Sequence, residues 1–148
     1  MNQTEIIQKV KEHLEKNGYE VYASSNGHGK GPDIFAMKGD ETFLIEAVGE
    51  TRSRRRSSQD ILISIGEVVK RMEKEPTKIR YGIAMPESFT RFLKDFEFGG
   101  FQALKLHLFI INEWGSVYHL DSQKTIEFLG KLRAGEEVYL PLMDVDYR

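Results

Sequence analysis

The 148-residue chain contains no cysteine, which excludes disulfide bonds, thiolate metal sites and cysteine nucleophiles. It has no apolar run approaching the roughly 18 residues of a membrane span, and residues 1–18 lack the apolar segment of a secretion signal. The net charge is only −2, so the chain as a whole is no polycation that attracts nucleic acid. These absences predict a cytoplasmic protein that does not enter a membrane.

The composition is that of a folding chain, with 40% hydrophobic and 30% charged residues, and the length suits one domain over residues 1–148. An amphipathic helix is predicted between a cap at Asn2 and a stop at Asn17-Gly18. Further helices are predicted at 57–73, 88–98 and 122–133, and strands at 19–23, 33–38, 42–48, 79–85, 104–112 and 117–120. The order αβββαβαββα describes a mixed α/β fold.

A predicted β-hairpin over residues 33–48 carries one carboxylate on each strand. Gly39-Asp40 suits a type II′ turn, and counting back from this turn places Asp33 directly opposite Glu46. Residues paired in this way point to the same face, with Cβ atoms about 4.5–5.5 Å apart, and like charges so placed destabilise a sheet. A divalent cation such as Mg²⁺ or Mn²⁺, which favours oxygen ligands, would offset this repulsion.

Each carboxylate also has a purely structural interpretation. An aspartate after a proline, here Pro32, is common in turns, and a glutamate near a strand end is often simply solvated. A β-bulge near Gly31 or Val48 would shift the register and separate Asp33 from Glu46. The pairing of the two residues nevertheless favours a functional site.

The same residues resemble the motif of the PD-(D/E)XK nuclease superfamily, the restriction-endonuclease-like fold. Pro32-Asp33 resembles its "PD", and Glu46-Ala47-Val48 stands in the place of its "(D/E)XK". The order of elements and motifs over residues 4–72 is similar to the first half of archaeal Holliday-junction resolvases. The resemblance implies a mixed β-sheet flanked by helices and a metal-dependent DNA endonuclease, in which Asp33, Glu46 and the carbonyl of Ala47 hold Mg²⁺ or Mn²⁺. It also implies a homodimer, because cutting two DNA strands usually needs two sites.

The sequence departs from the motif at the lysine, because Val48 occupies that position. Three polar residues are candidates to take its place in catalysis. Lys30 lies on the preceding loop, and Glu50 would point to the same face as Glu46 if the strand continued. Gln59 resembles a glutamine that many relatives place at the start of the next helix. For Lys30 and Glu50, a solvated surface role is an equal alternative.

Two further charged residues belong to the same helices. The resemblance to resolvases implies an additional carboxylate from Glu5 in the first helix, although Glu5 is equally suited to a solvated surface. Lys70 lies three turns further along the helix that starts near Gln59, which predicts that it is too remote from the site.

Positive charge is concentrated in a run of four arginines directly after the hairpin, namely Arg52, Arg54, Arg55 and Arg56. We expect this run to contact DNA phosphates and to position the duplex without reading bases, although charge runs are also common on solvated loops. Metal-ligand spacing is not found among the four histidines, which are His13, His28, His107 and His119.

Two functions therefore remain open at this stage. The first is a metal-dependent DNA endonuclease that hydrolyses phosphodiester bonds with a degenerate motif. The alternative is a catalytically inactive nuclease-fold module that binds DNA or another protein, which Val48 and the slightly acidic net charge favour. A weaker third interpretation is a protein-interaction domain whose hairpin carboxylates are incidental.

Overall fold

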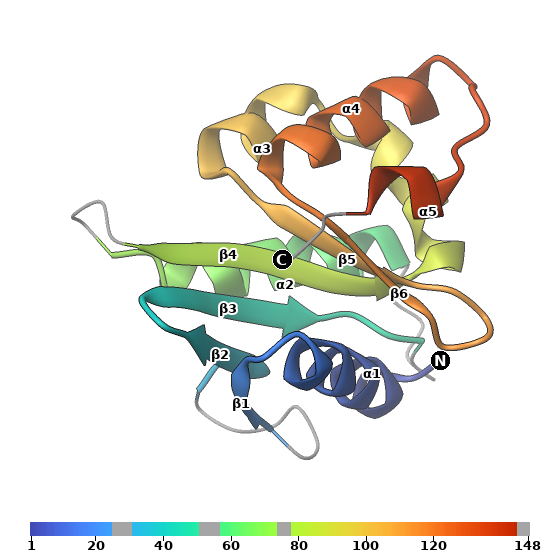
Figure 1. Ribbon diagram of the computed structural model, residues 1–148. Helices are drawn as coiled ribbons and strands as arrows, with labels where there is room; N and C mark the ends of the chain where they lie inside the picture. Colours follow the sequence, from blue (N-terminus) through green and yellow to red (C-terminus); the bar gives the residue numbers. More distant parts are fainter. Residues whose placement is uncertain (25–30, 51–56, 74–77, 145–148) are drawn as a thin grey trace.

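The computed structural model describes residues 1–24, 31–50, 57–73 and 78–144. Its centre is a six-stranded sheet in which the strands lie side by side in the order of the sequence (Figure 1). The strands are β1 Glu20–Ala23, β2 Ile34–Lys38, β3 Glu41–Ala47, β4 Ile79–Pro86, β5 His107–Ile111 and β6 Val117–Leu120. β3, β4 and β5 run parallel, whereas the other neighbouring strands are antiparallel.

Helices cover both faces of this sheet. They are α1 Gln3–Lys16, α2 Ser57–Lys70, the 3₁₀ helix η1 Glu87–Asp95, α3 Phe98–Leu104, α4 Ser122–Arg133 and α5 Leu140–Met143. α1 packs on one face, and α2, η1, α3 and α4 pack on the other. The expected fold class, a restriction-endonuclease-like mixed sheet flanked by helices, is confirmed.

The predicted helix at 88–98 is wrong in type and in extent. Residues 87–95 form a 3₁₀ helix, and the chain is extended at Phe96 before α3 begins at Phe98. Buried residues three apart, Thr90 and Leu93, suit the three-residue repeat of a 3₁₀ helix. α3 then occupies the start of the strand predicted at 104–112, which begins only at His107 because Lys105 closes the helix in the left-handed conformation.

The hairpin at the start of the site follows the predicted register. Gly39 has φ of +60°, as the first central residue of a type II′ turn requires, and Lys38 pairs with Glu41. The ladder continues without a bulge to the pair Ile34 and Ile45. The next pair along would be Asp33 and Glu46.

The hydrophobic core beneath α1 joins this helix to the hairpin strands. Ile6, Val10 and Leu14 recur along one side of α1 and are fully buried against Phe43 and Ile45. Burial of each large apolar side chain stabilises the fold by about 1.5–3 kcal/mol. The cap expected at Asn2 is present, since its Oδ1 accepts a hydrogen bond of 2.9 Å from the Glu5 N–H. The N-terminus of α1 is therefore held at a defined place beside β3.

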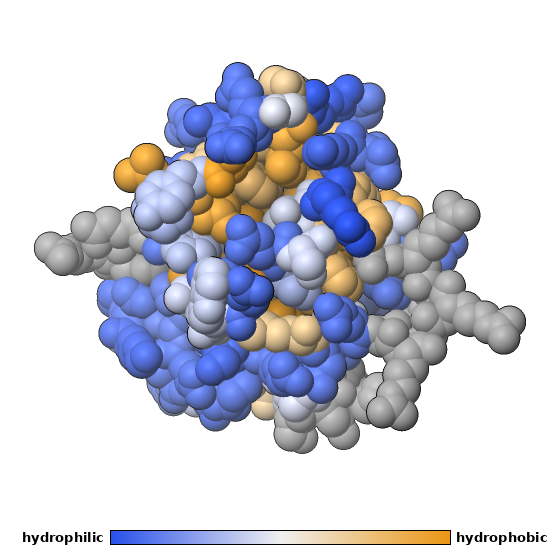
Figure 2. All heavy atoms as spheres, turned by 90° about the vertical axis from the view of Figure 1, so that its right-hand side faces the viewer, coloured by the Kyte–Doolittle hydropathy of each residue, from blue (hydrophilic) through white to orange (hydrophobic). Residues whose placement is uncertain are grey.

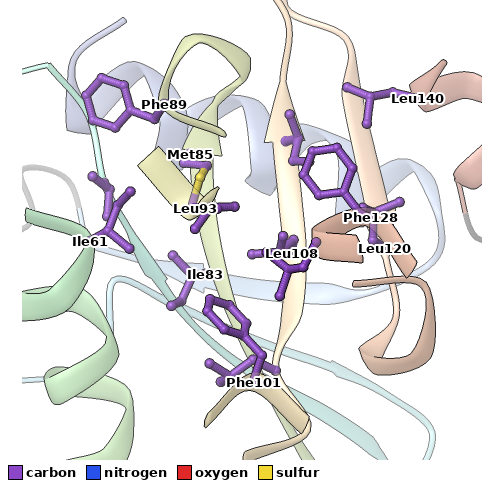
Figure 3. Close-up of a cluster of buried hydrophobic side chains, with 14 of the residues drawn as sticks. Ile61, Ile83, Met85, Phe89, Leu93, Phe101, Leu108, Leu120, Phe128 and Leu140 are labelled. Carbon is purple, nitrogen blue, oxygen red and sulfur yellow. The ribbon is translucent and has the colours of Figure 1, made fainter. Parts of the chain in front are cut away.

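A second core lies on the opposite face of the sheet, beneath α2, η1, α3 and α4. Ile83 and Leu108 project from the central strands into this core, where they meet Ile61 from α2 and Phe128 from α4 (Figure 3). Its cluster of buried residues also includes Val48, which follows β3. Side chains alternate across β3, so Glu46 shares this face with Val48 whereas Ile45 and Ala47 face α1.

The surface is unevenly polar. On the face at the right of Figure 1, hydrophilic residues dominate the lower half, whereas apolar atoms are exposed among them in the upper half (Figure 2). The exposed large apolar residues include Tyr139, which caps the start of α5, and Leu142 within α5. Within the described ranges, no helix is long and apolar enough to cross a membrane.

Candidate metal and nuclease site

Two buried carboxylates meet at the open end of the hairpin. Asp33 and Glu46 are each only 5% exposed, and their carboxyl groups lie close enough to share a hydrogen bond when Glu46 carries a proton. Asp33 immediately precedes β2, and its carbonyl accepts a hydrogen bond of 2.9 Å from the Ser24 N–H, so β1 and β2 fix its backbone. Parallel pairing with β4 fixes Glu46, which lies opposite Ile83. The structure thus brings together the two acidic residues that the sequence pairs.

The carboxylate of Asp33 is held by two donors. Its Oδ2 accepts a hydrogen bond of 2.8 Å from the backbone N–H of Ala47 and one of 3.2 Å from Nε2 of Gln3. The same Gln3 nitrogen also donates to the Ala47 carbonyl over 3.2 Å. Gln3 therefore bridges Asp33 and Ala47, two of the three proposed metal ligands, and orients both.

Sequence reasoning missed Gln3 and selected Glu5 from the same helix. Glu5 is exposed, whereas Gln3, the first residue of α1, points to the end of β3. This close approach depends on Gly49, where an added Cβ would collide with the backbone nitrogen of Gln3. A glycine two residues after the end of β3 is the kind of sequence signal that indicates another segment of backbone packing there.

Glu46 is held by Arg71, a second residue that the sequence did not reveal. Arg71 Nε donates a hydrogen bond of 2.8 Å to Glu46 Oε1, and its Nη2 donates one of 3.2 Å to the Gly31 carbonyl. Burial, followed by the hydrogen bond with Asp33, raises the pKa of Glu46 to about 7, while Arg71 opposes this rise. A carboxyl group that is buried beside a second carboxyl group shows such a rise in pKa, because its charged form is poorly solvated.

Val48 does not leave a space for a missing lysine. Its side chain is 3% exposed and belongs to the core cluster that also contains Ile61 of α2. A hollow of about 120 Å³ adjoins Val48 and is lined also by Gln3, Asp60 and Ser64. Asp60 therefore brings a further carboxyl group from α2 to the neighbourhood of the site, which the sequence analysis did not select.

The remaining predicted residues lie at different places. Glu50 is exposed, with Oε2 3.4 Å from the N-terminal ammonium of Met1, and Gln59 is exposed in the first turn of α2. Lys70 is exposed and pairs with Glu67 over 3.4 Å. Several candidates lie outside the described residues, and their predicted roles stay predictions: Lys30, Arg52, Arg54, Arg55 and Arg56.

The donor atoms at the end of β3 suit a hard divalent cation. Two carboxylates and one backbone carbonyl are oxygen ligands of the kind that Mg²⁺ and Mn²⁺ take, with water completing the coordination. Burial and the neighbouring Asp33 raise the pKa of Glu46, as expected for a carboxyl group that has lost its solvation beside a second acid. Asp33 and Glu46 form a pair rather than a triad, because no group of three or more His, Cys, Asp or Glu side chains within the described ranges is placed to hold a metal.

The six-stranded mixed sheet with helices on both faces is similar to two solved structures. One is an XisH family protein from Nostoc punctiforme PCC 73102, with a TM-score of 0.56, 17% identity, and coverage of 77% of this chain and 96% of that one. The other is a FdxN element excision controlling factor protein from Anabaena variabilis, with a TM-score of 0.56, 14% identity, and coverage of 77% and 95%.

At these identities the likeness shows the fold alone. No protein-family model and no curated protein matches the chain. Neither structural neighbour is described as an archaeal Holliday-junction resolvase, so that narrower resemblance stays a prediction.

Proposed function

We propose that this protein is a metal-dependent DNA endonuclease that hydrolyses phosphodiester bonds at the Asp33–Glu46 site. The observation that carries the proposal is the buried carboxylate pair at the end of β3, beside the carbonyl of Ala47. Burying two adjacent acidic groups costs stability, and a cation-binding function accounts for that cost. One structural neighbour is described as an excision controlling factor, which agrees with a DNA substrate for this chain.

Each residue has a defined role in this proposal. Asp33, Glu46 and the Ala47 carbonyl hold Mg²⁺ or Mn²⁺, and Gln3 orients two of these three groups. When bound, the ion would lower the pKa of the attacking water and stabilise negative charge on the phosphate. The arginine run at 52–56 binds the DNA backbone, and two copies of the chain act on the two strands. Light scattering of the purified protein, with and without DNA, tests the homodimer.

Cleavage assays test the proposed activity directly. Duplex, single-stranded and branched DNA are incubated with wild-type protein in Mg²⁺, Mn²⁺ or EDTA, and with Asp33→Asn and Glu46→Gln. Asp40→Asn is the matched control, because Asp40 is exposed on the hairpin turn and pairs with Lys78. We expect metal-dependent cleavage by wild type and by Asp40→Asn, and a loss of at least about 100-fold in the two site variants. Full activity of both site variants would refute the site.

The second candidate function is a noncatalytic nuclease-fold module that binds DNA or a protein. The burial of Val48 favours it, because the ammonium that would polarise water or phosphate is missing and its position is filled by core packing. Metal-dependent cleavage by wild type that Asp33→Asn abolishes would exclude this candidate. DNA binding without cleavage in either metal would establish it.

A further inference from the structure

Arg71 is fixed against both segments that form the acidic site. It lies one residue beyond the end of α2, where its Nε holds Glu46 and its Nη2 reaches the Gly31 carbonyl two residues before Asp33. Its Nη2 also lies 3.6 Å from Glu67 Oε2, one helical turn earlier. The guanidinium therefore has a defined position beside Glu46.

The side chain of Arg71 is only partly covered by its neighbours. The side chain of Arg71 is 22% exposed, and its Nη1 has no hydrogen-bond partner in the part of the chain that the structure describes. An arginine carries five N–H donors in a rigid plane and stays charged at every physiological pH, so one edge can hold a carboxylate while another binds a phosphate. Such a cation also offsets the repulsion between Glu46 and an approaching phosphate.

We propose that Arg71 is the phosphate-binding residue of this site, with Nε holding Glu46 and Nη1 donating to a phosphate oxygen of DNA. The inference rests on the proposed nuclease function and assigns to Arg71 the positive charge that Val48 does not supply. Lys70, the neighbouring cation, is exposed and pairs with Glu67 on the surface. In this arrangement Arg71 provides the positive charge that the lysine of the motif would provide, and Val48 is free to pack in the hydrophobic core.

Paired substitutions separate this contact from general electrostatics. Arg71→Ala and Lys70→Ala each remove one positive charge from adjacent positions, and Arg71→Lys keeps the charge without the planar donors. Affinity for a fluorescent DNA duplex is measured in Ca²⁺, a hard cation with similar ligand preferences. We expect a loss of about 10- to 100-fold for Arg71→Ala, an intermediate loss for Arg71→Lys, and less than about twofold for Lys70→Ala.

The affinity for Mn²⁺ distinguishes the proposed role of Arg71 from a merely structural one, because the two roles predict opposite changes. Removing the positive charge beside Glu46 should tighten Mn²⁺ binding to Arg71→Ala several-fold, by Coulomb attraction. A residue that only orients Glu46 would weaken Mn²⁺ binding when removed. Circular dichroism establishes that each variant is folded, and Arg71→Lys provides a second variant if Arg71→Ala is not.

Chemical rescue tests the role in cleavage. Millimolar guanidinium ion should restore cleavage to Arg71→Ala and leave Lys70→Ala unchanged. Equal DNA affinities of the Arg71 and Lys70 alanine variants, or weaker Mn²⁺ binding by Arg71→Ala, would overturn the inference. If wild type cuts no DNA but Arg71→Ala selectively loses DNA affinity, the proposed catalysis fails while the phosphate contact stands. Absence of DNA binding by wild type would overturn both.

Discussion

Glu46→Gln should stabilise the metal-free protein at alkaline pH. The pKa of Glu46 is about 7 in the folded protein, against 4.5 for the unperturbed side chain. Between these values the folded protein keeps a proton that the unfolded chain has lost, so the free energy of unfolding falls as pH rises. At 1.36 kcal/mol per pKa unit, raising the pH from about 5 to about 8 removes about 2.5 kcal/mol of stability.

Glutamine imitates the protonated form of Glu46, because it accepts from Arg71 and donates to Asp33. The variant should match wild type near pH 5 and exceed it by about 2.5 kcal/mol near pH 8, which corresponds to about 7 °C in melting temperature. Urea unfolding in EDTA, followed by circular dichroism over this pH range, measures the difference. Subtracting wild type from variant cancels the titration of distant groups, and the exposed Glu87→Gln serves as control.

The result has two informative alternatives. A constant stability difference between Glu46→Gln and wild type across this pH range would refute the conclusion that burial and Asp33 raise the pKa of Glu46. A variant that loses stability near pH 8 would mean that the ion pair with Arg71 outweighs desolvation, which would reverse the electrostatic account of the site.

Two other predictions concern the stability of the fold. Burial lowers the pKa of His107 to about 4, and the pKa of His119 is also lowered, so the unfolded chain binds protons first below about pH 6.5. Acidification from about pH 7 to 5 should therefore remove about 2 kcal/mol through His107, and His107→Gln should lessen this loss in urea unfolding. Gly49→Ala should lower the free energy of unfolding by more than about 2 kcal/mol, because its Cβ collides with Gln3. Gly130→Ala places its Cβ in open space on a helix and should raise the free energy of unfolding by up to about 1 kcal/mol. Thermal unfolding measures both changes. Equal melting temperatures for these two glycine variants would contradict the close approach.

The hairpin was predictable because local chemistry determines it. The two-residue turn needs a positive φ at its first position, which Gly39 allows, and this turn sets the register of the two strands. In that register, the alternation of side chains places Asp33 beside Glu46. The N-terminal helix was predictable for the same reason, since its cap at Asn2 lies within a single turn. These features need no knowledge of how distant segments pack.

Gln3 and Arg71 could not be found in this way, because their contacts join residues 30 and 25 positions apart. The rotation of a helix about its axis decides which of its residues faces the strand, and packing sets that rotation. Counting turns along helix 57–73 predicted only that Lys70 is too remote from the site, whereas the next residue, Arg71, binds Glu46. The helix at 88–98 failed differently, since its apolar spacing fits a 3₁₀ helix as well as an α-helix.

Calorimetric titration of Mn²⁺ into the metal-free protein tests the central claim most directly. Wild type and Asp40→Asn should bind one ion per chain, while Asp33→Asn should lose this binding because one of the two carboxylates is neutralised. Urea unfolding of each protein establishes that the loss does not come from unfolding. Equal Mn²⁺ affinities of wild type and Asp33→Asn, or no binding by either, would contradict a metal site at the end of β3.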